Sequence, residues 1–247
     1  MKPTSSKIRL DMLLVERELV PTREKARALI MSGVVFVRGM VVDKAGTPVP
    51  HDAEITLKGE EHPYASRGGV KLKGALDEFG VDIRGCVALD VGVSTGGFTD
   101  CLLQEGATKV YAVDVGYGQL AWKLRQDQRV VVFERTNIRY FTGERIEEPI
   151  DVTTIDVSFI SLKLVLPPIL RLLRDGAVIL ALIKPQFEAG RADVGKKGVV
   201  RDPSVHRRVI EEIVAFSREL NLTVIATCES PITGPQGNRE FFMYAKK

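Results

Sequence analysis

A glycine-rich turn at residues 90–97 contains the residue types best suited to hold a ligand close to the backbone. It follows the apolar run Cys86–Leu89 and precedes an apolar stretch that begins near Phe98, which is the order of a strand, a turn and a helix. The turn places an acid and small residues close together: Asp90, Gly92, Ser94, Gly96 and Gly97. Glycine permits positive φ angles and leaves no Cβ between chain and ligand. The spacing differs from Gly-x-Gly-x-x-Gly, which seats a pyrophosphate, and an opening acid suits a cationic ligand.

A second apolar run, residues 109–113, ends at Asp114, where a carboxylate can accept hydrogen bonds from both hydroxyls of a ribose. These two acids together predict S-adenosylmethionine, an adenosine with a sulfonium and an amino-acid tail but no phosphate. We expect Asp90 to lie near the ammonium of that tail, with Gly92, Ser94 and the other small residues of the turn under it. We expect Asn137, which follows a third apolar run, to meet the adenine edge. Other α/β proteins carry similar turns, so further residues are needed to decide.

Charged residues also end two later apolar runs. Residues 151–155 lead into Asp156, and residues 178–183 lead into Lys184. Ligands of open parallel sheets bind outside the carboxyl ends of the strands, so we expect both side chains to face one crevice with the two earlier acids. A lysine at a strand end commonly just meets water. Four charged strand ends on one sheet favour a site instead.

Several motifs together resemble the TlyA group of FtsJ-like ribosomal RNA 2′-O-methyltransferases, also labelled hemolysin A. They lie at residues 90–98, 114–120, 156–162, 184–188 and 238–242. The motifs, in this order, cover nearly the whole chain. The resemblance implies a Rossmann-like α/β domain that binds S-adenosylmethionine and needs no metal. It also implies a catalytic tetrad: Lys71, Asp156, Lys184 and Glu240. Lys73 competes with Lys71 for the first place, and the motif position favours Lys71.

Methyl transfer from a sulfonium is an in-line displacement, so catalysis depends mainly on aligning one oxygen behind the methyl carbon. Lys184 could act as a general base if a nearby cation and burial lowered its pKa. Alternatively it stays charged and stabilises the developing alkoxide. Both alternatives stay open at this point. The fourth strand ends Asp156-Val157-Ser158-Phe159, without the Asn/Asp-Pro-Pro-aromatic motif typical of methylation at exocyclic amines.

The N-terminal residues resemble an S4 RNA-binding domain. Helix patterns at residues 9–20 and 23–32, with Thr22 as N-cap and Gly33 as stop, precede short valine- and isoleucine-rich pieces. The residues expected to contact RNA are basic: Arg9, Arg23, Lys25 and Arg27. A basic helix face can lie along phosphates. Interleaved acids would equally fit a solvated charged face, and the S4-like pattern favours RNA.

The sequence therefore predicts an S4-like α+β domain at residues 1–59, a linker at 60–66 and a methyltransferase domain at 67–247. We expect helices at 70–79 and 204–220 and a last strand at 240–244. Net charge +3 permits nucleic-acid binding without demanding it. Three cysteines without Cys-x-x-Cys spacing predict buried free thiols in a reducing, cytoplasmic compartment. No apolar run reaches the roughly 18 residues of a membrane span.

The resemblance implies cytidine 2′-hydroxyls of ribosomal RNA as substrate. The chain ends soon after Glu240, without the extension associated with members that modify both subunits, which favours the large subunit and keeps the small one open. Three alternatives remain: an RNA- and cofactor-binding assembly factor without turnover, a small-molecule O-methyltransferase, and a membrane-lytic protein. The charged, glycine-rich segment 186–202 is predicted to be either a lid or RNA clamp, or a plain surface loop.

Overall fold

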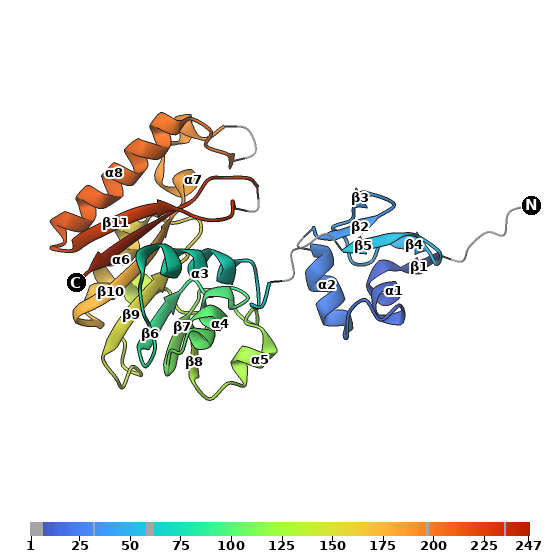
Figure 1. Ribbon diagram of the computed structural model, residues 1–247, viewed down its shortest axis with the longest axis horizontal. Helices are drawn as coiled ribbons and strands as arrows, with labels where there is room; N and C mark the ends of the chain where they lie inside the picture. The colour runs from blue at the N-terminus through green and yellow to red at the C-terminus, as the bar shows by residue number, and fades with distance from the viewer. Residues whose placement is uncertain (1–6, 32, 58–61, 196–197, 235) are drawn as a thin grey trace, which may run out of the picture. The chain divides into compact units, whose positions relative to one another are not determined.

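The computed structural model describes residues 7–31, 33–57, 62–195, 198–234 and 236–247. The chain divides into two compact units, Met1–Glu61 and His62–Lys247, which run from blue to light blue and from teal to red in Figure 1. Part of the predicted linker, residues 60 and 61, lies outside the described residues.

The N-terminal unit packs two short helices on small antiparallel sheets. Its elements are β1 (Lys7–Arg9), α1 (Leu10–Glu16), α2 (Arg23–Met31), β2 (Val35–Val37), β3 (Met40–Val41), β4 (Pro48–Pro50) and β5 (Ile55–Leu57). Strand β1 pairs with β4, and β2 lies between β3 and β5. The core is built from apolar residues one helical turn apart, such as Leu10, Leu13 and Leu14, which are fully buried.

Both predicted helices of this unit exist, with different ends. Helix α1 stops at Glu16 rather than Val20, because the chain turns back at Glu18, whose φ is 56°. Thr22 caps α2 as predicted, since its Oγ1 accepts a hydrogen bond from the backbone N of Lys25 at 3.2 Å. Strands β1 and β4 were not predicted: they are three residues long, and prolines flank β4's single valine.

The second unit is a seven-stranded sheet with the order β11-β12-β10-β9-β6-β7-β8. The strands are β6 (Val87–Val91), β7 (Lys109–Val113), β8 (Val130–Phe133), β9 (Ile150–Ile155), β10 (Leu173–Ile183), β11 (Thr223–Glu229) and β12 (Phe241–Lys246). Strand β12 runs antiparallel to both β10 and β11, whereas the other pairs are parallel. The chain proceeds from β6 toward β8 on one side and from β9 toward β10 on the other. The crevice of this doubly wound sheet therefore lies at the carboxyl ends of β6 and β9.

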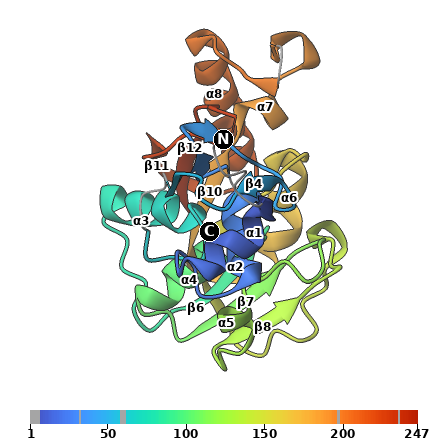
Figure 2. The same ribbon diagram turned by 90° about the vertical axis from the view of Figure 1, so that its right-hand side faces the viewer.

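Helices cover both faces of this sheet, as Figures 1 and 2 show. Helices α3 (Gly68–Phe79), α4 (Gly97–Gln104) and α5 (Trp122–Arg125) contribute to the core on one face. Helices α6 (Leu162–Leu170) and α8 (Pro203–Glu219) pack on the other, where η1 (Ile138–Tyr140) contacts α6. Alternate residues of one strand serve the two cores: Ala88 packs under α3 and α4, and Leu89 packs under α6 and α8. The predicted Rossmann-like fold class is confirmed.

The segment that follows β10 contains two short helical turns, α7 (Pro185–Glu188) and η2 (Arg191–Asp193), and α7 contacts α8. Residues 196 and 197 of this segment lie outside the described residues. Of the three free cysteines, Cys101 is buried, whereas Cys86 and Cys228 are half-buried, so the prediction of burial was right for one of them. Within the described ranges, no helix has the length and apolar character required to cross a bilayer.

Candidate active site

The glycines of the turn between β6 and α4 are required by the neighbouring protein chain. Gly92 has a φ of 88°, and a Cβ there would lie 2.4 Å from the carbonyl oxygen of Asp156. Gly96 has a φ of 95°, and its Cβ would meet a methyl group of Leu124 at 2.4 Å. A Cβ on Gly97 would lie 2.3 Å from Oγ of Ser66. The turn therefore packs against three other segments at distances that exclude any side chain.

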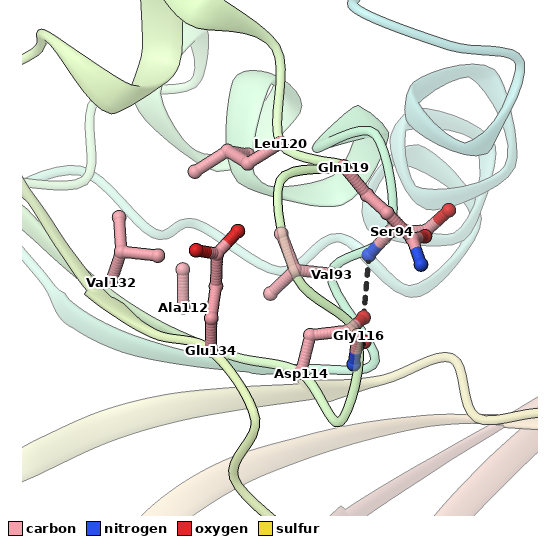
Figure 3. Close-up of a pocket in the computed structure, with 9 residues that line it drawn as sticks. All are labelled: Val93, Ser94, Ala112, Asp114, Gly116, Gln119, Leu120, Val132 and Glu134. Carbon is pink, nitrogen blue, oxygen red and sulfur yellow. Dashed lines mark hydrogen bonds between the residues drawn. The ribbon is translucent and has the colours of Figure 1, made fainter.

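Next to this turn lies a pocket, drawn in Figure 3. It is lined by Val93, Ser94, Ala112, Asp114, Gly116, Gln119, Leu120, Val132 and Glu134. The carboxylate of Asp114, which directly follows β7, accepts hydrogen bonds from the backbone N of Ser94 at 2.7 Å and of Gly116 at 2.6 Å. These bonds hold the turn after β6 against the turn after β7. The pocket thus combines apolar walls with carboxylates at the strand ends.

Glu134 is a pocket residue that the sequence reasoning missed. It directly follows β8, as Asp114 follows β7, so the same rule of an acid ending an apolar run would have found it. Its carboxylate forms an ion pair with Arg125 and accepts a hydrogen bond from the backbone N of Gly118 at 2.7 Å. The bond to Arg125 holds the pKa of Glu134 below its usual value. Asn137 does not line the pocket: its side-chain oxygen accepts a hydrogen bond from the backbone N of Arg139 and caps η1.

Asp90 lies inside β6 and is fully buried. Its two oxygens accept hydrogen bonds from the hydroxyls of Thr99 on α4 at 2.6 Å and of Thr154 on β9 at 2.9 Å. Burial raises the pKa of Asp90 to about 7. These contacts join the first strand, the helix after the turn and the fourth strand. A contact between Asp90 and the cofactor stays a prediction.

Two lysine–carboxylate pairs are the main charged feature of the second unit. Nζ of Lys71 on α3 donates to Oε2 of Glu240 at 2.6 Å, and the two residues are 7% and 1% exposed. Nζ of Lys184 lies 2.5 Å from Oδ1 of Asp156 and donates to Oγ of Ser158 at 3.1 Å. Lys184 is 8% exposed. Each buried ammonium is therefore neutralised by a carboxylate, as burial of a charge requires.

The two pairs meet at one end of the sheet. Strands β10 and β12 are neighbours (Figure 1), and Ile183 lies opposite Phe241 at the end of their antiparallel ladder. Lys184 and Glu240 are the next residues outward in this register. Directly opposed residues on one face bring their Cβ atoms to within about 5 Å.

Both side chains point to the face of the sheet that α3 covers. Leu182 and Phe242, two positions further in along each strand, belong to the core under α3 and α4. Side chains alternate between faces along a strand, so the alternation carries Lys184 and Glu240 to the same face. The observed contact of Glu240 with Lys71 on α3 agrees with this.

Lys73, the competitor for the first tetrad position, faces elsewhere. Its Nζ bonds to Asp77 at 2.7 Å and to Glu105 at 3.2 Å, both outside the pairs described above. Of the two lysines on α3, the structure brings Lys71 to Glu240.

An exposed aromatic side chain stands beside the lysine pairs. Phe159, one residue after Ser158, is 90% exposed and has a φ of 63°. Its ring lies 4.9 Å from that of Phe187, and Nζ of Lys184 lies 6.0 Å from the Phe187 ring centroid. A bulky residue with positive φ is strained, and such strain persists where the surrounding structure imposes it.

The four predicted RNA-binding residues of the N-terminal unit fall into two groups. Arg9 and Arg23 both bind Asp11, whose carboxylate is fully buried, with Nε–Oδ distances of 2.9 and 3.0 Å. The hydrogen bond to Arg9 contributes most to lowering the pKa of Asp11, to about 2. Lys25 and Arg27 are exposed on α2. Two of the four cations therefore also stabilise the unit itself.

A doubly wound sheet with charged residues at its carboxyl edge and a carboxylate-lined pocket is the arrangement of α/β proteins that bind a ligand at this edge. This chain belongs to the FtsJ-like methyltransferase family, whose model matches residues 64–247, and an S4 domain model matches residues 8–55.

Relatives match over nearly the full chain. YqxC of Bacillus subtilis is 53% identical over 242 residues, which covers 98% of this chain and 86% of the relative. The 16S/23S rRNA (cytidine-2′-O)-methyltransferase TlyA of Mycobacterium tuberculosis is 44% identical over 239 residues, covering 96% of this chain and 89% of the relative. A solved structure described as a hemolysin from Streptococcus thermophilus is 45% identical, covers 98% of this chain and 89% of its own, and superposes with a TM-score of 0.77.

Proposed function

We propose that this protein transfers a methyl group from S-adenosylmethionine to the 2′-hydroxyl of a cytidine in ribosomal RNA. The observation that carries the proposal is the pair of buried lysine–carboxylate contacts, Lys71–Glu240 and Lys184–Asp156, beside the crevice of the sheet. The names of the relatives from Mycobacterium tuberculosis and Campylobacter jejuni, both cytidine-2′-O-methyltransferases of ribosomal RNA, support the same reaction. The proposal assigns residues 1–59 to RNA binding, 60–66 to a linker and 67–247 to transfer.

The side chains that line the pocket suit an adenosine without phosphates. Carboxylates line it at Asp114 and Glu134. Each oxygen of Asp114 has a lone pair beyond the one used by the backbone N–H of Ser94 or Gly116. Asp114 would accept hydrogen bonds from both ribose hydroxyls, and Glu134 would face the adenine base. The turn at Gly92–Gly97 would carry the amino-acid tail. Negative side chains around the pocket also favour a sulfonium over a phosphate.

When bound, the cofactor supplies an electrophilic methyl carbon. The protein must then hold one hydroxyl oxygen in line with it, and alignment of this kind accounts for much of the barrier lowering. Lys184 is ion-paired with Asp156 and bonded to Ser158, so its Nζ is fixed in position. As an ammonium it would donate to the 2′-oxygen and stabilise the alkoxide that develops there, and the proton of the hydroxyl would pass to water. The geometry thus favours electrostatic stabilisation over a general-base role for Lys184.

Lys71 and Glu240 form the second half of the site. Glu240 directly precedes β12 and is held by Lys71 from α3, so the pair connects the end of the sheet to a helix. The proposed role of Glu240 is to orient the hydroxyl and to balance the charge of Lys71. The exposed ring of Phe159 suits stacking with an unpaired base, which RNA-binding proteins commonly use.

Methylation of isolated ribosomal subunits tests the proposal. Subunits from a strain that lacks this modification are incubated with the protein and labelled S-adenosylmethionine, and the wild type is compared with Lys184→Ala. We expect label in the RNA, resistant to alkaline cleavage next to the modified ribose, and its loss in the variant. Running the two subunits separately identifies the substrate.

Two other outcomes would point to other functions. Cofactor binding without label on either subunit would refute the ribosomal substrate and favour a small-molecule acceptor. RNA and cofactor binding without any transfer would favour an assembly factor.

A further inference from the structure

Two arginine–tyrosine contacts lie on the surface beside the pocket. The guanidinium carbon of Arg135 is 4.3 Å from the ring centroid of Tyr117, and that of Arg139 is 5.2 Å from the ring centroid of Tyr140. Both tyrosines are well exposed, at 66% and 72%. We refer to these four residues as the arginine–tyrosine surface.

The backbone joins this surface to the pocket. The N of Arg135 donates to the carbonyl of Gly116 at 2.9 Å, and the N of Thr136 donates to the carbonyl of Asp114 at 2.9 Å. Both acceptors belong to residues that line the pocket. The surface therefore lies at the carboxyl ends of β7 and β8, the same edge of the sheet at which Lys184 ends β10.

The charges of the surface are available to a ligand. Within the parts of the chain that the structure describes, neither Arg135 nor Arg139 forms an ion pair with a carboxylate. The nearby Arg125 and Arg129 are paired, with Glu134 and Asp127. The difference separates two arginines that are held by carboxylates from two exposed arginines, of which Arg139 donates from Nε to Oδ1 of Asn137 at 3.4 Å.

Arg135 also has an unusual backbone. Its φ is 52°, in the left-handed region, where residues with a Cβ are disfavoured. The hydrogen bond to Gly116 holds it there and turns its side chain over the ring of Tyr117. Strained non-glycine residues cluster at ligand-binding sites.

We propose that the arginine–tyrosine surface binds unpaired nucleotides that flank the methylated one. This inference rests on the proposed RNA substrate and adds a second contact region within the methyltransferase unit. Tyrosine rings and guanidinium planes stack on bases, and guanidinium N–H groups bond to phosphates. Single-stranded RNA presents bases and phosphates, and each of the two contacts offers a ring and a guanidinium.

The test replaces the contact between Arg139 and Tyr140, neither of which lines the pocket. The double variant Arg139→Glu/Tyr140→Ala is compared with Arg84→Glu, the same charge change on an exposed arginine that is paired with Asp82 and precedes β6, at the opposite edge of the sheet. Two probes are used: labelled oligocytidylate for binding, and unmodified ribosomal subunits for methylation. Cofactor affinity and thermal unfolding are measured for every variant.

For the double variant we expect oligocytidylate affinity to fall at least fivefold and KM for subunits to rise by a similar factor. The slope of log affinity against log salt should become shallower by about one for each phosphate that the variant no longer binds. The kcat and the cofactor affinity should stay unchanged, because neither residue lines the pocket. Replacing Tyr140 by Phe instead of Ala keeps the ring and should restore the part of the oligocytidylate affinity that comes from stacking. Arg84→Glu should have the affinity and KM of wild type.

Unchanged oligocytidylate affinity and KM would overturn the inference while leaving methylation of subunits by the wild type as evidence for the proposed function. A loss confined to cofactor affinity would also overturn it, because the surface would then only support the pocket. If the wild type fails to methylate subunits but the double variant still loses oligocytidylate binding, the surface is an RNA site and the proposed reaction is wrong.

Discussion

The Lys71–Glu240 pair offers the sharpest test of how burial and catalysis are connected in this protein. The two side chains are 9% and 1% exposed and lie 2.6 Å apart. Removal of one partner leaves a buried charge without its counter-charge. The changes considered are Lys71→Met, Glu240→Gln and the two combined.

Breaking a buried pair by removing one partner costs about 3 to 5 kcal/mol of unfolding free energy. For a unit of the size of His62–Lys247, this corresponds to a fall in Tm of about 6 to 20 °C. Removing both charges eliminates the desolvation cost of the ions. It leaves one buried amide without its partner, which destabilises the fold by about 1 to 3 kcal/mol. The double variant should therefore be more stable than either single variant.

The assay is thermal unfolding followed by circular dichroism, together with methyl transfer to ribosomal subunits at a temperature where all variants are folded. All three variants should lose about 10²-fold in transfer rate, because the double variant recovers stability but not the alignment of the hydroxyl. Lys73→Met is the matched control. Its side chain is 37% exposed and paired at the surface, where such contacts contribute about 0 to 1 kcal/mol, so stability and activity should hardly change.

Additive losses of stability would refute the reasoning, because additivity means that the two side chains do not interact in the folded protein. Recovery of activity in the double variant would refute the catalytic part alone. The pair would then be a structural connection between α3 and β12.

Three further outcomes follow from buried polar groups. The pKa of Asp90 is raised to about 7 in the folded protein. Its contribution to stability is therefore full below about pH 4 and is lost as pH rises to 7. The Tm of Asp90→Asn should accordingly rise relative to that of wild type between pH 5 and pH 8. Asp11, with a pKa lowered to about 2, behaves oppositely: wild-type protection of α1 amides from hydrogen exchange should weaken as pH falls below about 4, and Asp11→Asn should be less protected already at pH 7. Asn238 is 3% exposed, and its side chain accepts a hydrogen bond from the backbone N of Val200 and donates one to the carbonyl of Gly198. Asn238→Ala should therefore speed proteolysis of segment 186–202 and lower kcat more than cofactor affinity. Equal cleavage rates would show that the two bonds do not hold the segment.

Local pattern predicted most of the fold because a parallel sheet leaves a strong signal. Strands that are buried on both faces read as apolar runs, and three of the four predicted runs end directly before the predicted charged residue: Asp114, Asp156 and Lys184. The prediction was wrong for Asp90, which lies inside β6. Helix α8 follows the spacing of Val205, Val209 and Ile213 and starts one residue earlier than predicted, at Pro203. The very short strands β1 and β4 were missed, because three residues carry too little periodicity to be recognised.

The site was predictable where an acid ends a strand and less so where side chains reach across the fold. Asp114 and Glu134 obey the same rule, although only Asp114 was predicted. Asn137 was chosen by position along the chain, yet it caps η1, because an amide followed by a helical turn bonds to the nearby backbone N–H. Arg9 and Arg23 were predicted to contact RNA, which stays a prediction, and sequence spacing does not reveal that both bind Asp11.

By itself, the sequence determined the alternation of strands and helices, the turn after β6 and the identity of the charged residues, because these depend on neighbours along the chain. The tertiary structure decided which charges pair. Lys71 and Glu240 lie 169 residues apart, and they meet because β12 inserts antiparallel beside β10 and delivers Glu240 under α3. That insertion depends on packing of the whole sheet, and no local pattern encodes the distance between two residues so far apart.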